Sequence, residues 1–199
     1  MRELRQTMEI IASKVKRGAL IIFEGVDRCG KTTQCKRLVE SLCKSGVPTA
    51  FMRFPDRETT IGKMIDAYLK SKADLDDRAI HLLFSANRWE KKAELLSLLN
   101  KGTTVVVDRY AFSGVAFSGS KDKLSLEWCR NSDRGLPKPD AVIFLDISVE
   151  DASKRGEFGA ERYEKVRFAP PKSCPLLLLW ILGPFVIIDR GKGLSSHPD

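Results

Sequence analysis

The sequence contains the run Gly25-Val26-Asp27-Arg28-Cys29-Gly30-Lys31-Thr32, which fits the pattern G-x-x-x-x-G-K-[ST] at every position and indicates the fold class. An apolar, strand-like run over 19–23 precedes it, and a helix-like run over 33–44 follows it. In that context the chain leaves a strand, turns tightly on glycines and enters a helix, so backbone N–H groups converge ahead of the helix. These N–H groups and the helix dipole favour a bound anion. The sequence therefore predicts a phosphate loop that binds a nucleoside triphosphate.

Individual residues of this loop have expected roles toward ATP. Gly25 and Gly30 allow the tight turn, and Lys31 brings a positive charge to the β- and γ-phosphates. The Thr32 hydroxyl is a candidate Mg²⁺ ligand, and Thr33 completes the expected ATP-binding set. The alternative is a glycine turn with a chance lysine, which the strand and helix on either side argue against.

Length and composition fit one α/β domain with enough chain for a buried core: 199 residues with a net charge of +8. The basic residues are dispersed, without a Lys/Arg block or an interleaved aromatic platform, which favours a small polyanionic substrate over nucleic acid.

The five cysteines contain no C-x-x-C pair, which argues against a disulfide framework or a zinc site and for a reducing compartment. Residues 1–16 lack the apolar core of a secretory signal. We expect an intracellular protein, cytoplasmic in the first place, with the nucleus and the mitochondrion left open.

Strand-like and helix-like runs alternate along the chain. Further strands are expected at 49–54, 103–108 and 140–146, and helices at 61–69, along a loose apolar stripe within 75–99, and from 147 to 155. This alternation predicts a parallel sheet flanked by helices. Ligands of such sheets bind at the carboxyl ends of the strands. Those ends carry the phosphate loop, residues 53–57, residues 108–110 and the segment after 146.

A phosphate loop alone does not separate kinases, switch GTPases and motor ATPases. A GTPase would need Asn-Lys-x-Asp after a strand, but the pair Asn100-Lys101 continues into Gly-Thr, so that box is absent. Arg57, Arg88 and Arg109 suggest instead a second anionic ligand that faces the first. A nucleoside monophosphate kinase requires this arrangement.

Several motifs resemble those of thymidylate kinase, most closely the eukaryotic enzymes. They lie at 54–57 (Phe-Pro-Asp-Arg), 83–89, 107–117, 135–140 and 155–164, so the likeness runs from about residue 17 to residue 164. The resemblance implies an α/β P-loop nucleoside monophosphate kinase that phosphorylates dTMP to dTDP with ATP and Mg²⁺. It also implies a homodimer, with no nucleic acid and no membrane as partner.

The resemblance also implies how the base and sugar of dTMP are bound. Phe84 would stack on the thymine ring, and Arg88 would hydrogen-bond to the base edge. Phe117 would pack against the deoxyribose, Asp27 would meet the 3′-hydroxyl, and Tyr163 would close near the sugar. Judged without the resemblance, Phe84 and Phe117 are better explained as core residues, because they lie in apolar surroundings.

A second group of implied roles concerns the phosphates. Arg57 and Arg109 would hold the phosphate of dTMP, with Phe54 beside them in the dTMP site. Asp108 would organise Mg²⁺ through water. Arg28 would follow the migrating γ-phosphoryl group, so that Arg28, Lys31, Asp108 and Arg109 form the expected catalytic set.

The likeness divides the chain into an N-terminal extension (1–16), a kinase-like domain (17–164) and a divergent segment (165–199). Within the domain, 155–164 is the expected lid, and Arg155 belongs to the ATP-binding set. Four prolines between 165 and 188 argue against a long amphipathic helix there. We interpret 165–199 as an aberrant end, such as that of a splice product, which leaves the fold incomplete and the chain a candidate for an impaired, nucleotide-binding variant. A last strand at 185–188 is the rival interpretation, and a membrane anchor is disfavoured because the apolar run is short and interrupted.

Overall fold

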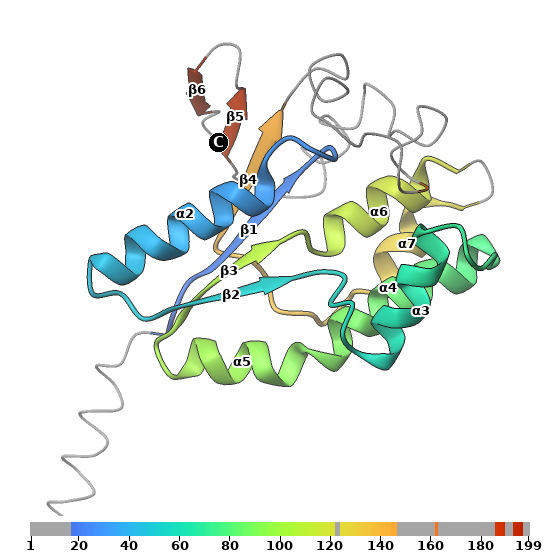
Figure 1. Cartoon of the computed structure of the whole chain (residues 1–199), viewed down its shortest axis with the longest axis horizontal. Coiled ribbons are helices and arrows are strands. Elements are labelled where there is room, and N and C mark those ends of the chain that lie inside the picture. Colours follow the sequence, from blue (N-terminus) through green and yellow to red (C-terminus); the bar gives the residue numbers. More distant parts are fainter. Residues whose placement is uncertain (1–16, 122–123, 147–161, 163–185, 190–192, 197–199) are drawn as a thin grey trace, which may run out of the picture.

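The structure is a computed structural model that describes residues 17–121, 124–146, 162, 186–189 and 193–196. Strands and helices alternate along most of these residues (Figure 1). The strands are β1 (Leu20–Gly25), β2 (Thr49–Arg53), β3 (Thr104–Asp108), β4 (Ala141–Asp146), β5 (Val186–Asp189) and β6 (Gly193–Ser196). The helices are α2 (Lys31–Lys44), α3 (Thr60–Leu69), α4 (Asp77–Glu90), α5 (Lys92–Asn100), α6 (Ala111–Gly119) and α7 (Leu126–Asn131).

The strands form one sheet in the order β2-β3-β1-β4-β5-β6. Neighbouring strands run parallel throughout, except that β6 is antiparallel to β5. Phe23 of β1 and Arg53 of β2 both lie in register with Asp108 of β3. The carboxyl ends of these three strands therefore reach the same edge of the sheet, and the predicted parallel sheet is confirmed.

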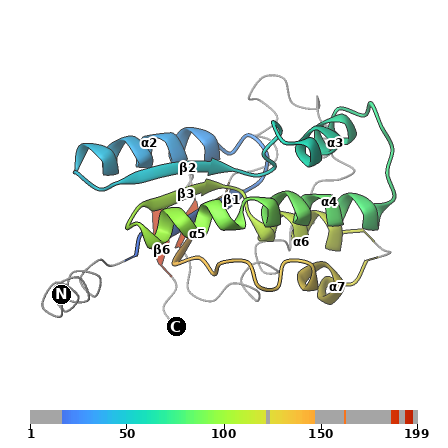
Figure 2. The ribbon, with the colours of Figure 1, turned by 90° about the horizontal axis from the view of Figure 1, so that it is seen from below.

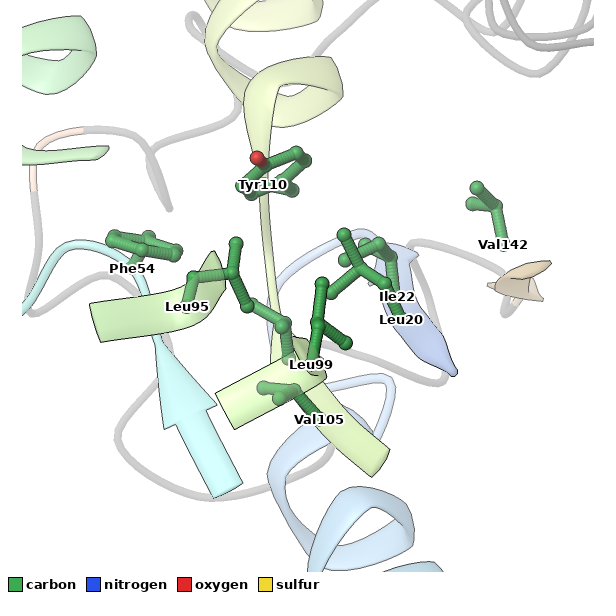
Figure 3. Packing of buried hydrophobic residues seen from close by; sticks show 9 residues of the cluster. Leu20, Ile22, Phe54, Leu95, Leu99, Val105, Tyr110 and Val142 are labelled. Carbon is green, nitrogen blue, oxygen red and sulfur yellow. The ribbon is translucent and has the colours of Figure 1, made fainter. Parts of the chain in front are cut away.

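The two faces of the sheet are covered by different helices, with α2 on one side and α5 on the other (Figure 2). On the α5 side, Leu20, Ile22 and Val105 pack with Leu95 and Leu99 in a core cluster that Figure 3 shows from close by. Successive strand residues point to opposite faces, so the neighbouring positions supply the second cluster on the α2 side. That cluster contains Phe23, Val106 and Cys35.

Three helical features differ from the expectation. The stripe within 75–99 is two helices, α4 and α5, which meet at Lys91, and the Asp76 side chain caps α4 by accepting from the N–H groups of Arg78 and Ala79. Helices α6 and α7 were not expected. The phosphate-loop helix α2 begins at Lys31, two residues earlier than expected.

The carboxyl-terminal segment contributes strands to the sheet. Val186–Asp189 pairs in parallel with β4, from Ile143 opposite Val186 to Asp146 opposite Asp189. Of the interpretations of this segment, the described backbone supports a last strand. The expected helix over 147–155 and the rest of 165–199 lie outside the described residues. None of the helices in the described part of the chain combines the length and apolar character needed to cross a membrane.

Candidate active site

A cleft of about 380 Å³ opens where β1, β2 and β3 end, between the phosphate loop and helices α4 and α6. It gathers most of the residues that the sequence singled out. Those that line it are Asp27, Arg28, Gly30, Lys31, Thr32, Thr33, Phe54, Arg57, Phe84, Arg88, Asp108, Arg109 and Phe117. Gly25 is the last residue of β1 and leads into the loop. Arg155 and Tyr163 lie outside the described residues, as does the expected lid except for Arg162. The individual roles of these residues stay predictions.

The phosphate loop turns through left-handed backbone conformations, with φ of 63° at Arg28 and 94° at Gly30. Gly30 is the N-cap of α2, so the loop delivers its N–H groups to the start of that helix. The Lys31 ammonium donates to the carbonyl of Val26 at 2.6 Å. Burial and the nearby charge of Arg109 lower the pKa of Lys31. The loop therefore holds a buried cation, and a bound phosphate would offset the free-energy cost of burying that charge.

An oxygen pair sits beside this cation. The Thr32 hydroxyl, in the first turn of α2, donates to Oδ2 of Asp108 at 2.5 Å. Asp108 is the last residue of β3 and is buried. A hydroxyl and a carboxylate are ligand types that Mg²⁺ accepts together with phosphate oxygens and water. The donor chemistry of this pair fits a magnesium ion.

Arg109 stands between the two ends of the cleft. Its guanidinium donates to Asp27 Oδ1 at 2.5 Å, to Ser113 Oγ at 2.8 Å and to the carbonyl of Gly25 at 3.2 Å. It lies over the ring of Phe117, with 5.7 Å to the ring centroid. Burial alone would raise the pKa of Asp27, but the charges of Arg109 and Lys31 outweigh burial and lower that pKa. Asp27 is thus held as a carboxylate beside a cation that faces the cleft.

Glu24 supports this arrangement and was missed by the sequence analysis. It is fully buried in β1, where Oε1 accepts from the backbone N–H groups of Tyr110 at 2.9 Å and Ser113 at 3.2 Å, and Oε2 accepts from Ser113 Oγ at 2.5 Å. Burial raises the pKa of Glu24, and the charge of Arg109 opposes that rise. The available signal was an acidic residue inside an apolar strand, a position where a charge needs a partner.

The far end of the cleft is built by α4 and by the loop after β2. Phe84 and Arg88 lie four residues apart on α4 and therefore share one helix face. Arg57 pairs with Asp66 of α3 at 2.7 Å. The amide of Asn87 holds the loop by accepting from the Asp56 N–H at 2.8 Å and donating to the Asp56 carbonyl at 3.1 Å.

Phe54 contributes to the core as well as to the cleft. Its ring is buried and lies 5.9 Å from that of Tyr110, both within the cluster of Figure 3. Seven further residues line the cleft but were not predicted as site residues: Arg53, Pro55, Leu69, Tyr110, Ser113, Gly114 and Ser118. The sequence did offer a signal for some of them, because Tyr110, Ser113 and Gly114 belong to the motif at 107–117 and Arg53 ends a strand.

The cleft has a phosphate loop at one end and faces it with cations and aromatic rings at the other, on a parallel sheet covered by helices. These features together define a P-loop kinase of the nucleoside monophosphate type. A family model described as thymidylate kinase matches residues 23–171. The chain belongs to the thymidylate kinase family.

Individual relatives agree with this placement. The chain is 56% identical over 153 residues to thymidylate kinase of Homo sapiens, covering 77% of this chain and 72% of the relative. The same identity and coverage hold for thymidylate kinase of Danio rerio. The solved structure of thymidylate kinase from Candida albicans superposes with a TM-score of 0.76 at 38% identity, covering 87% of this chain and 85% of that one.

Proposed function

We propose that the chain transfers the γ-phosphoryl group of ATP to dTMP by in-line displacement, forming ADP and dTDP. The observation that carries this proposal is the single cleft that joins the phosphate loop to the aromatic and cationic wall of α4 and α6. Membership of the thymidylate kinase family supports the choice of both substrates.

The donor end would hold ATP through the backbone of the phosphate loop, including Gly30 and Thr33, with the Lys31 ammonium on the β- and γ-phosphates. Thr32 and Asp108 would hold Mg²⁺, the threonine directly and the aspartate through water. When bound, this ion neutralises charge on the donor phosphates. Arg28 would follow the migrating γ-phosphoryl group.

The acceptor end would hold dTMP with its base toward α4 and its phosphate toward the middle of the cleft. Phe84 would stack on the base, Phe117 would pack against the deoxyribose, and Asp27 would meet the 3′-hydroxyl. Arg57 and Arg109 would neutralise the acceptor phosphate. Two polyanions repel each other, so these residues act chiefly by positioning and neutralisation. The attacking phosphate oxygen is already ionised, and the transfer needs no strong general base.

Steady-state kinetics of the full chain with ATP, Mg²⁺ and dTMP test the proposal. We expect ADP and dTDP in equal amounts, and a much raised KM for dTMP in Arg57→Gln because the acceptor phosphate loses a cation. Arg37→Gln is the matched control, since Arg37 is exposed on α2, away from the cleft lining. ATP hydrolysis without dTDP, or equal KM values in the two variants, would contradict the proposal.

We further propose that the chain acts as a homodimer in the cytoplasm. The family resemblance supports both points, and the free thiols at Cys29, Cys35, Cys43 and Cys129 agree with a reducing compartment. Light scattering at micromolar concentration tests the assembly: a mass near twice 22.3 kDa is expected, and a monomer mass would refute it.

A further inference from the structure

The base end of the cleft is closed by a buried ion pair between Arg88 of α4 and Asp133. Arg88 donates from Nε to Oδ1 of Asp133 at 3.0 Å and from Nη2 to Oδ2 at 2.7 Å. The two side chains are 2% and 6% exposed. Such a two-point pair fixes the plane of the guanidinium as well as its position. Arg88 therefore has one buried, defined orientation at the cleft.

Asp133 is itself held in place from the same helix. Ser85, three residues before Arg88 on α4, donates its hydroxyl to Oδ1 of Asp133 at 2.8 Å. The carboxylate thus receives hydrogen bonds from Ser85 and Arg88 together. A buried aspartate with these partners is a fixed support for the guanidinium and not a mobile surface charge.

Helix α6 confines the guanidinium from a second direction. A Cβ atom on Gly114 would lie 3.0 Å from Nη2 and 3.4 Å from Nη1 of Arg88. The backbone of α6 approaches this closely because residue 114 has no side chain. Asp133 engages the N–H of Nε and one N–H of Nη2. The two N–H groups of Nη1 and the second N–H of Nη2 are therefore the donors left for a ligand, at the wall that Arg88 and Gly114 contribute to the cleft.

The chemistry of this wall favours one kind of ligand group. A guanidinium nitrogen donates and cannot accept, so its partner must offer a lone pair. The charge of Arg88 is already balanced by a buried carboxylate, which weakens its attraction for a phosphate but leaves its N–H groups able to bind a neutral carbonyl oxygen. Phe84, on the same helix face, adds an aromatic surface for a planar ring.

We propose that Asp133 is a positioning residue that sets the base specificity of the cleft, by holding Arg88 with N–H donors toward position 4 of a pyrimidine. A 4-oxopyrimidine such as thymine or uracil accepts these donors. A 4-aminopyrimidine such as cytosine opposes N–H to N–H and is rejected. The inference rests on the proposed function and deepens it by assigning the specificity to a residue outside the cleft lining.

The test compares kcat/KM for dTMP and dCMP in Asp133→Asn. An asparagine amide keeps the size of the side chain but replaces one of the two acceptor oxygens by an NH2 donor, which faces an N–H of the guanidinium. The two-point pair is therefore lost and Arg88 is released. We expect the dTMP/dCMP ratio of kcat/KM to fall at least about tenfold, because dTMP loses one hydrogen bond to a charged group and dCMP does not. The fall comes chiefly from the KM for dTMP, while the KM for ATP and the kcat at saturating dTMP stay within about threefold.

The matched control is Asp140→Asn, which breaks a second two-point arginine–aspartate pair. Asp140 accepts from Arg17 at 2.9 and 2.5 Å and is partly exposed. This variant is expected to lower stability and to leave the selectivity ratio unchanged. An unchanged ratio in folded Asp133→Asn, or an equal fall in both variants, overturns the proposal.

A milder variant covers the case in which Asp133→Asn does not fold. Ser85→Ala removes one hydrogen bond to the carboxylate, and a fall of the ratio of about threefold is expected; no fall overturns the proposal. Wild-type protein that phosphorylates neither nucleotide refutes the proposed function separately. The same comparison is then made by calorimetric titration of dTMP and dCMP into wild type and variants, where equal selectivity in all of them overturns the inference.

Discussion

Replacing Lys31 by methionine removes a buried positive charge from the phosphate loop while keeping a side chain of similar length. Lys31 is 6% exposed, and its ammonium donates to the Val26 carbonyl at 2.6 Å. A buried carbonyl left without a hydrogen-bond donor costs about 1–3 kcal/mol. The Val26 carbonyl still accepts from the N–H of Cys29 at 3.5 Å in the variant, so the cost is smaller. Burial lowers the pKa of Lys31, which means that the charged side chain is unfavourable in the folded protein. Removing the charge therefore raises stability and opposes the loss of the hydrogen bond. We therefore expect the nucleotide-free variant to melt within a few degrees of wild type, or above it.

Binding and turnover respond differently, because the charge is needed when phosphates are present. ATP at 100 times its Kd stabilises a protein by about 2.7 kcal/mol, which raises the Tm of a domain of this size by roughly 5–10 °C. We expect most of this shift to vanish in Lys31→Met. A donor aimed at transition-state charge contributes about 10²–10³ in kcat, and we expect a loss of that size.

Differential scanning fluorimetry with and without ATP, together with steady-state turnover, measures both effects. Lys44→Met is the matched control, because Lys44 ends the same helix and is exposed, paired with Glu40 at 2.7 Å. The control is expected to keep the ATP shift and the turnover. Wild-type turnover in Lys31→Met would refute the reasoning, and so would a variant that unfolds without nucleotide but keeps its ATP shift.

Three further outcomes are expected. Phe84→Ala raises the KM for dTMP by about tenfold or more, since base–aromatic stacking contributes about 1–3 kcal/mol, and leaves the KM for ATP near the wild-type value. In the control Phe51→Ala, which changes an exposed ring, both KM values stay near wild type. An unchanged KM for dTMP in Phe84→Ala would exclude stacking. Leu95→Ala lowers the free energy of unfolding in urea by about 2–5 kcal/mol, whereas the half-exposed Leu96→Ala costs well under half of that. Burial lowers the pKa of His81 below 6.5, so its neutral form contributes stability above pH 6.5 that is lost as the pH falls toward the lowered pKa. Wild type should lose up to about 1.4 kcal/mol per pH unit there, His81→Gln less, and parallel pH profiles would contradict this.

The parts of the fold that the sequence predicted are those set by local patterning. The runs that became β1 to β4 were placed within about two residues, because a strand of a parallel sheet is a short run rich in apolar and β-branched residues, bounded by turn residues. One topological rule predicted that the phosphate loop and residues 108–110 meet at the same edge of the sheet, where the structure pairs Thr32 with Asp108, 76 residues away. Parallel strands end at one edge, and residues at those ends meet there.

The helices that the sequence missed depend on long-range contacts. Helix α6 contains glycines and lacks a local N-cap side chain. Its first N–H groups are accepted by Glu24, up to 89 residues earlier in the chain. The break between α4 and α5 carries no glycine or proline, and the loop contact from Asn87 to Asp56 holds α4 in place just before it. Local propensity contains none of this information.

The candidate site shows the same division. Residues in the loop and in strand ends were predicted, whereas supporting residues such as Asp133 and Glu24 were not. Asp133 reaches Arg88 across 45 residues, and the sequence around it resembles an ordinary polar turn. Such partners are chosen by packing in three dimensions, and only the assembled structure identifies them.

In the proposed reaction, two nucleotides meet in one cleft and a phosphoryl group passes directly from one to the other. The stereochemical course at phosphorus tests it, using ATP made chiral at the γ-phosphorus by oxygen isotopes and a sulfur atom. Direct in-line transfer to dTMP predicts a chiral product that carries the label on dTDP with inverted configuration. Retention of configuration, or label recovered in inorganic phosphate with none on dTDP, would contradict the account.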